Sequence, residues 1–197
     1  MTPRIVLAVL VLLVSGGAAG CSSDATASSV MPACAEGADE TAANGVILMA
    51  QSVPTASYVP CVRTGLPLGW SFHHLHARNG TASFWLNSDR DGQQAIEVRL
   101  DPSCDTAGAT QIPSDREGMD RFERVRMTTP DFKGERYYVF DGGCLTVVFE
   151  LTGEGRGEPL ALATQAVGVV HREDVLAQVH EDSDGRLSLD PAEEGGE

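Results

Sequence analysis

Alternating apolar and polar residues, interrupted by glycine-containing turns, constrain the fold of this chain more than any other feature. Residues 70–77 follow a period of two, and the Asn79-Gly80 pair after them is a strong hairpin signal. The returning segment, 81–87, places Phe84 and Leu86 on one face. The pattern predicts antiparallel strands with one buried face and one face in contact with water.

The same alternation recurs downstream. Further strands are expected around 96–100 and over 121–127, followed by a second hairpin of 136–140 and 144–151. Helical spacing predicts a short helix over 38–52, a second that begins at Pro159 and reaches Val167, and a third over 172–180. Since the strands come first and the helices last, we expect one α+β domain, mainly antiparallel sheet, with C-terminal helices packed on it.

The N-terminus carries a single positive charge, Arg4, followed by ten apolar residues from Ile5 to Val14. As a helix these ten residues would rise about 15 Å, roughly half of a bilayer core, so they are too short to span a membrane. They have the length of a signal-peptide core, and small residues lead from them to Cys21.

This segment resembles the signal peptide of bacterial lipoproteins, in which small residues, the lipobox, precede a cysteine. The resemblance implies cleavage after Gly20, a diacylglyceryl thioether on Cys21 and an extracytoplasmic protein anchored to the outer face of the cell membrane. Ala18 departs from the leucine that is commoner at its position. The alternative is an ordinary secretory signal cut at an A-x-A-like site.

The resulting division of the chain has four parts. They are a signal peptide (1–20), the lipidated cysteine with a flexible Ser- and Ala-rich tether (21–33), the folded domain (34–189) and a disordered tail (190–197).

Four cysteines remain in the domain once Cys21 is set aside: Cys34, Cys61, Cys104 and Cys144. An even number in an exported domain predicts two disulfides, with three pairings open. We favour Cys34–Cys61 and Cys104–Cys144 because these pairs close the shorter loops, and each would contribute roughly 3–4 kcal/mol. Zinc binding by thiolates is disfavoured, because no C-x-x-C spacing occurs.

His74 and His76 are the first candidate metal ligands. On a strand they share a face, which by alternation also carries Trp70 and Phe72, while His73 faces the opposite way. Two imidazoles at this spacing can bind zinc or copper if the fold supplies a third ligand. A structural or surface role is the alternative.

A second candidate resembles the opening of an EF-hand-type calcium loop. Asn87, Asp89 and Asp91 occupy the first ligand positions and Gly92 follows them, but Val98 stands where the motif needs a glutamate. Residues 182–185 form a weaker partial copy. A plain hairpin turn explains the first segment without calcium.

Evidence for catalysis is weak. The chain has no nucleophile elbow, no H-E-x-x-H, no P-loop and no dinucleotide-binding motif, so we expect no catalytic residues and no cofactor. Other candidates are three acidic residues in one loop, which could pair across a cleft, and two histidines that flank the last helix. They are Asp115, Glu117, Asp120, His171 and His180.

The formal charge of −14 argues against nucleic acid as a partner. We therefore expect a membrane-anchored, non-catalytic binding or envelope-assembly module, whose partner is another envelope protein, a cell-wall polymer or a small ligand. The alternatives are a secreted hydrolase with a site assembled from distant loops, and a surface protein that binds zinc, copper or calcium.

Overall fold

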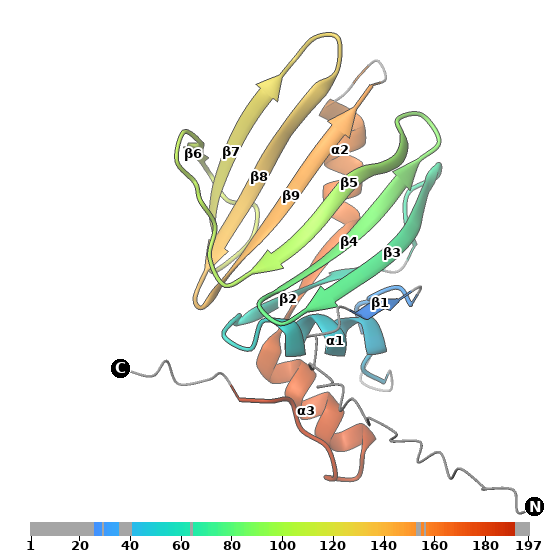
Figure 1. The fold of residues 1–197 in the computed structure, drawn as a ribbon, viewed down its shortest axis with the longest axis vertical. Helices are drawn as coiled ribbons and strands as arrows, with labels where there is room; N and C mark the ends of the chain where they lie inside the picture. The colour runs from blue at the N-terminus through green and yellow to red at the C-terminus, as the bar shows by residue number, and fades with distance from the viewer. Residues whose placement is uncertain are drawn as a thin grey trace, which may run out of the picture.

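An eight-stranded antiparallel sheet dominates the computed structural model of the chain (Figure 1). The structure describes residues 26–28, 30–35, 41–63, 65–152, 155 and 157–191. In the order in which they lie side by side, the strands are β1 (Thr26–Ser28), β3 (Trp70–Arg78), β4 (Thr81–Ser88), β5 (Gly92–Asp101), β9 (Gly143–Leu151), β8 (Phe132–Phe140), β7 (Asp120–Met127) and β6 (Thr110–Ile112). Every neighbouring pair runs antiparallel, which confirms the α+β fold built mainly from hairpins.

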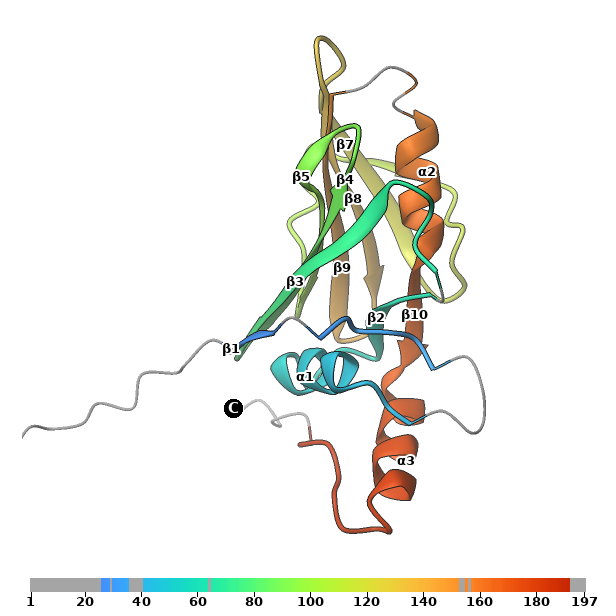
Figure 2. The same ribbon diagram turned by 90° about the vertical axis from the view of Figure 1, so that its right-hand side faces the viewer.

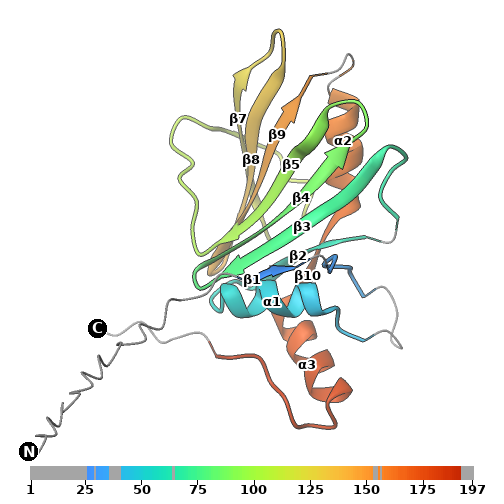
Figure 3. The same cartoon turned by 45° about the vertical axis from the view of Figure 1, so that its right-hand side comes forward.

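A two-stranded ribbon and three helices complete the domain. The ribbon pairs β2 (Tyr58–Val62) with β10 (Val167–His171), and the helices are α1 (Asn44–Ser52), α2 (Gly157–Ala166) and α3 (Arg172–Asp182). α2 lies along one face of the main sheet, while α1 and the ribbon lie at the end of the sheet from which α3 projects (Figures 2 and 3). None of the described helices or strands covers the other face of the sheet (Figure 2).

The inner face of the main sheet changes from apolar to charged along its width. One row of inward-facing residues crosses six strands and consists of Leu75, Phe84, Val98, Val147, Arg136 and Glu123. The first four have no exposed side-chain surface, which confirms the predicted buried faces of β3, β4, β5 and β9. The last two lie on β8 and β7, beneath α2, and leave a polar area on the inner face.

A β-bulge in β3 changes the face of the sheet on which Trp70 and Phe72 lie. The pairing with β4 shifts by one residue between Phe72 and His74, since Phe72 lies opposite Leu86 and His74 lies opposite Trp85. The extra residue turns Trp70 and Phe72 toward the core, against which both pack. The prediction that they share a face with His74 and His76 was wrong, because alternation holds only while the register is unbroken.

Both favoured disulfides are confirmed. Cys34 is bonded to Cys61 of β2, with 5.0 Å between their Cα atoms, and Cys104 is bonded to Cys144 of β9, with 5.7 Å between theirs. The first ties the start of the domain to the ribbon. The second holds the long 102–119 segment against the main sheet.

The predicted helices are correct in place and differ at their ends. α1 begins at Asn44, after extended residues 41–43, whereas 36–40 lie outside the described residues. α2 begins at Gly157, two residues before Pro159, and gives way at Val167 to β10. Val167 fits the helical spacing of α2, but it also opens the β-branched run Val-Gly-Val-Val, and pairing with β2 decides between the two.

The ends of the domain reach beyond the expected boundaries. The signal peptide and Cys21 lie outside the described residues, but Thr26–Ser28, within the expected tether, form β1 against β3. At the other end, the backbone N–H of Asp190 donates to Gln51 Oε1 at 2.9 Å, and its carbonyl accepts from Arg172 at 2.7 Å. The domain therefore extends through Asp190, and residues 192–197 of the expected tail are outside the described residues.

Candidate functional site

An open cleft of about 930 Å³ lies where the β2–β10 ribbon, the C-terminal end of α2 and the loop 113–118 meet. β10 supplies Val167, Val169 and His171, which are alternate residues and so face the same way. Tyr58, opposite His171 in the ribbon, completes this side of the cleft.

Aromatic packing fixes the Tyr58 end of the cleft. The rings of Tyr58 and Phe140 pack edge to face, with centroids 5.3 Å apart. The ring of His171, on the paired strand β10, lies 4.4 Å from the Tyr58 ring. Across the cleft, a Cβ at position 118 would lie only 2.7 Å from the Tyr58 hydroxyl oxygen, and Gly118 has φ +71°. Glycine at 118 therefore lets the loop close against Tyr58.

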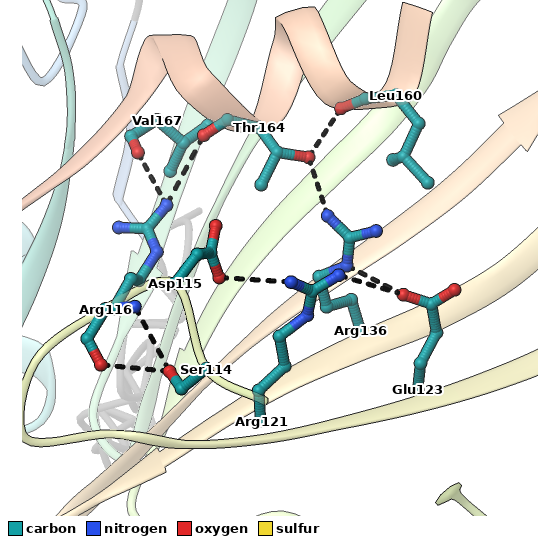
Figure 4. Close-up of polar contacts among 9 residues, drawn as sticks. All are labelled: Ser114, Asp115, Arg116, Arg121, Glu123, Arg136, Leu160, Thr164 and Val167. Carbon is teal, nitrogen blue, oxygen red and sulfur yellow. Dashed lines mark hydrogen bonds and ion pairs between the residues drawn. The ribbon is translucent and has the colours of Figure 1, made fainter. Parts of the chain in front are cut away.

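Arg116 forms the wall between the loop and α2 (Figure 4). Its Nη2 donates to the carbonyl oxygens of Val167, at 2.6 Å, and Thr164, at 3.4 Å. Thr164 lies in the last turn of α2, where backbone acceptors have no partner within the helix, and Val167 is the first residue of β10, directly after it. Arg116 thus caps α2 with a positive charge, which also complements the partial negative charge of the helix terminus.

An ionic network beneath α2 links the loop to two strands of the main sheet (Figure 4). Arg121 of β7 contacts Asp115 at 3.3 Å and Glu123 at 3.5 Å. Arg136 of β8 donates to Glu123 at 2.9 Å and, through Nη1, to the Thr164 hydroxyl at 3.3 Å. The charged residues at the β7 side of the inner face are thereby paired with one another and with α2, while Arg121 Nε is buried without a hydrogen-bond partner among the described residues.

These contacts influence the pKa of Asp115, a carboxylate that lines the cleft. Burial raises the pKa of Asp115, but backbone hydrogen bonding, the nearby Tyr138 hydroxyl and the positive charges of Arg121 and Arg116 outweigh it and hold the pKa below its usual value. Asp115 is thus a paired acceptor whose surroundings favour the charged form. A general acid requires the opposite shift, which keeps the proton on the carboxyl group.

The structure brings together three of the residues that sequence reasoning had considered for catalysis. Asp115, Glu117 and His171 all line the cleft. Asp120 does not, because β7 turns it away from the inner face, opposite Val139. His180 lies at the far end of α3 from His171. The alternation of residues over 167–171 is a signal that could have placed His171 on a strand, on the same face as Val167 and Val169.

His74 and His76 lie on the other, uncovered face of the main sheet. The His74 ring stacks on Trp85 of β4, with centroids 4.4 Å apart and planes 15° from parallel, and His73 meets its edge at 4.6 Å. Burial, and then the charges of His73 and His76, lower the pKa of His74. Within the described part of the chain, no group of three or more His, Cys, Asp or Glu side chains is placed to hold a metal ion.

The segment that resembles a calcium loop is the β4–β5 turn, and its side chains are engaged there. Asn87 Oδ1 accepts the backbone N–H of Gln94 at 3.0 Å. Asp91 accepts the Ser88 hydroxyl at 2.8 Å and the backbone N–H of Thr152, at the end of β9, at 3.0 Å. The Asp89 backbone N–H donates to the Gly69 carbonyl at 2.8 Å. The segment thus fastens the turn to its neighbours.

Among the described residues, no helix is both long enough and apolar enough to cross a membrane. Comparisons of the chain with protein-family models, with curated proteins and with solved structures found no match.

Proposed function

We propose that the protein is an exported lipoprotein, attached through Cys21 to the outer face of the cell membrane, whose domain binds a ligand without acting on it chemically. The sequence up to Cys21 supports the anchor, and the two disulfides support an oxidising compartment, where such bonds form and persist. The cleft between the ribbon, α2 and the loop 113–118 is the binding site under this proposal.

The pairing of Asp115 with Arg121, at 3.3 Å, is the observation that favours binding over hydrolysis. Hydrolysis by paired carboxyl groups needs one of them to retain a proton, and the contact of Asp115 with Arg121, together with the nearby charge of Arg116, acts against this at Asp115. The cleft thus offers fixed charges and hydrogen-bonding groups in the arrangement of a recognition site.

The lining of the cleft selects an amphipathic ligand. Val169 and the Tyr58 ring form an apolar side. Arg63 and Gln165 are exposed at the rim and carry polar groups that a ligand can reach. A ligand with an apolar side and a polar or charged end, such as a segment of another envelope protein, fits both parts.

Site-specific photocrosslinking in intact cells tests the site. A benzophenone amino acid placed at Gln165, in the cleft, is expected to capture a defined partner in the native envelope. The control is the same group at Leu176, which is exposed on α3 and outside the lining of the cleft. Equal products from both positions, or none at position 165, would contradict a ligand in the cleft.

The anchor is tested separately. Mass spectrometry of the mature N-terminus is expected to find a lipid-modified Cys21, and globomycin is expected to cause the uncleaved form to accumulate. An unmodified N-terminus at any other residue would contradict the anchor and leave the proposed cleft unaffected.

A further inference from the structure

The uncovered face of the main sheet carries two polar rows that cross six strands. The first row consists of His74, Trp85, Glu97, Val148, Glu135 and Arg124, and the second of His76, Ser83, Arg99, Thr146, Tyr137 and Phe122. We call this surface the outer face. At about 4.8 Å between strands, the two rows extend over roughly 24 Å.

Two adjacent hollows lie on the outer face and meet at β5. The larger, of about 710 Å³, reaches from His76 and Trp85 to Arg99 and Asp101. The smaller, of about 300 Å³, shares Arg99 and Asp101 and continues toward Tyr137. Together they form one track across the strands, with a length that suits an extended chain.

Two carboxylates along this track, Glu97 and Glu135, are paired with arginines. Glu97 accepts from Arg99 Nε at 3.0 Å and from the Ser83 hydroxyl at 3.1 Å. Farther along, Glu135 lies 2.6 Å from Arg126 and accepts the Tyr137 hydroxyl at 2.8 Å. The larger hollow as a whole is lined by two arginines and two carboxylates. A surface balanced in this way attracts neither polyanions nor polycations strongly.

The paired groups still have hydrogen-bonding capacity, because each carboxylate has several acceptor positions and each guanidinium five donors. Beside them, Trp85 contributes an aromatic ring to the lining of the larger hollow, where the stacked His74 holds it in place. In the larger hollow, donors, acceptors and an apolar ring surface with balanced charge complement a sugar chain, whose hydroxyl groups both donate and accept and whose C–H faces stack on aromatic rings.

We propose that the outer face binds a neutral polysaccharide chain of the cell wall, independently of the cleft on the opposite side of the sheet. The inference relies on the proposed function only for location, since export and anchoring would bring the domain beside the wall. The protein would then hold a wall glycan on one side of the sheet and its cleft ligand on the other.

Glycan binding is tested with the full chain, expressed in its native envelope with a C-terminal affinity tag and purified in mild detergent. The chain is expected to sediment with isolated, protein-free cell-wall sacculi. A soluble hexamer of N-acetylglucosamine is expected to compete, whereas dextran sulfate is not. Because the ion pairs are internal to the protein, binding is expected to change by no more than about twofold between about 0.05 and about 0.5 M NaCl.

Two variants locate the interaction. Arg99→Ala and Trp85→Ala are each expected to weaken binding at least roughly tenfold, by loss of hydrogen bonds or of the stacking surface. The Arg99 side chain is 39% exposed, so its removal spares the core and keeps the test valid if Trp85→Ala is poorly folded. Trp85→Phe, which retains a ring, is expected to bind more tightly than Trp85→Ala. Arg186→Ala, at an exposed arginine away from the sheet, is the matched control and should bind as the wild type does.

Absence of sedimentation, unchanged binding by Arg99→Ala and Trp85→Ala, or competition by dextran sulfate with loss of binding in salt would each overturn the inference. The last outcome would identify an anionic polymer instead. Crosslinking from position 165 is expected to persist in Arg99→Ala, so failure at the outer face is distinguishable from failure at the cleft. A chain that binds the hexamer but carries no lipid would contradict the anchor alone.

Discussion

The guanidinium carbon of Arg116 lies 4.7 Å from the centroid of the Tyr138 ring, so that a cation rests on an aromatic face at the base of the cleft. Tyr138 is fully buried on β8, and the same guanidinium group caps α2. One side chain from an otherwise exposed loop therefore joins the loop, the main sheet and α2.

Arg116→Ala is expected to destabilise the domain by about 2–3 kcal/mol, because it removes a charged donor to the carbonyls of Thr164 and Val167, where α2 passes into β10, together with the cation–π contact. Urea unfolding at neutral pH measures the change. Arg186→Ala, which removes an arginine whose side chain is 77% exposed, should alter stability by no more than about 0.5 kcal/mol. Equal effects of the two variants would show that Arg116 has no capping role.

Gly142→Ala is expected to cost about 2 kcal/mol or more. Gly142 sits in the β8–β9 turn with φ +66°, and an added Cβ would collide with the backbone carbonyl of Thr55. Gly80→Ala is the matched control, because Gly80 also has positive φ, at +86°, but nothing lies within 4 Å of its Cβ position. If both variants unfold at the same urea concentration, the expected collision of a Cβ at position 142 with Thr55 is refuted.

Loss of each disulfide should destabilise the protein, by slightly more for the longer of the two loops. Sequence separations of 27 and 40 residues correspond to about 3.5 kcal/mol for Cys34–Cys61 and about 4 kcal/mol for Cys104–Cys144 in the chain-entropy description. Paired Cys→Ser variants, each compared with the oxidised wild type by urea unfolding, measure the two contributions. A reductant is expected to reproduce the combined loss and to have no effect on the chain lacking all four cysteines.

Glu135 is expected to make stability depend on acid pH. Burial raises its pKa, but hydrogen bonds from Tyr137 and Arg126 and the charges of Arg126 and Arg124 lower it below the ordinary value of 4.5. A carboxyl group with a lower pKa in the folded state contributes stability above its unfolded pKa, and this contribution is lost as the pH falls through the folded value.

Glu135→Gln should therefore reduce stability at pH 7 and flatten its decline below about pH 4.5. Urea unfolding over that range checks the slope. Glu150→Gln is the control, because Glu150 is 61% exposed and pairs with Lys133 at the surface. A decline in Glu135→Gln as steep as in the wild type would assign the acid sensitivity to other groups.

The parts of the fold that could be predicted from the sequence are those specified locally. The hairpin at Asn79-Gly80 follows from turn chemistry and from the alternation on both sides of it. Both signals lie within about ten residues of the turn. The bulge at His73 was not predictable in this way. It is a property of the register between β3 and β4, and it reversed the faces of Trp70 and Phe72.

The cleft depends on contacts between distant segments and was not predicted as a unit. From the sequence, Asp115 and Glu117 are interpreted as solvated acidic residues in a loop, and His171 as a residue at the end of a helix. They come together because β10 pairs with β2 and because Arg116 fastens the loop to α2. Neither contact produces a periodic pattern in the sequence. The sequence could therefore indicate these residues as candidates for a site, but not that they lie together.

If Cys21 carries the proposed lipid, the short strand β1 limits how far the main sheet can lie from the bilayer. Five Cα steps separate Cys21 from Thr26, a reach of at most about 18 Å. A lipid on Cys21 would keep the β1 edge of the main sheet close to the lipid headgroups. The far edge, at β6, lies seven strand spacings away, or about 34 Å. The main sheet would then project from the bilayer edge-first, and the strands of the outer face would lie at successive heights above the membrane.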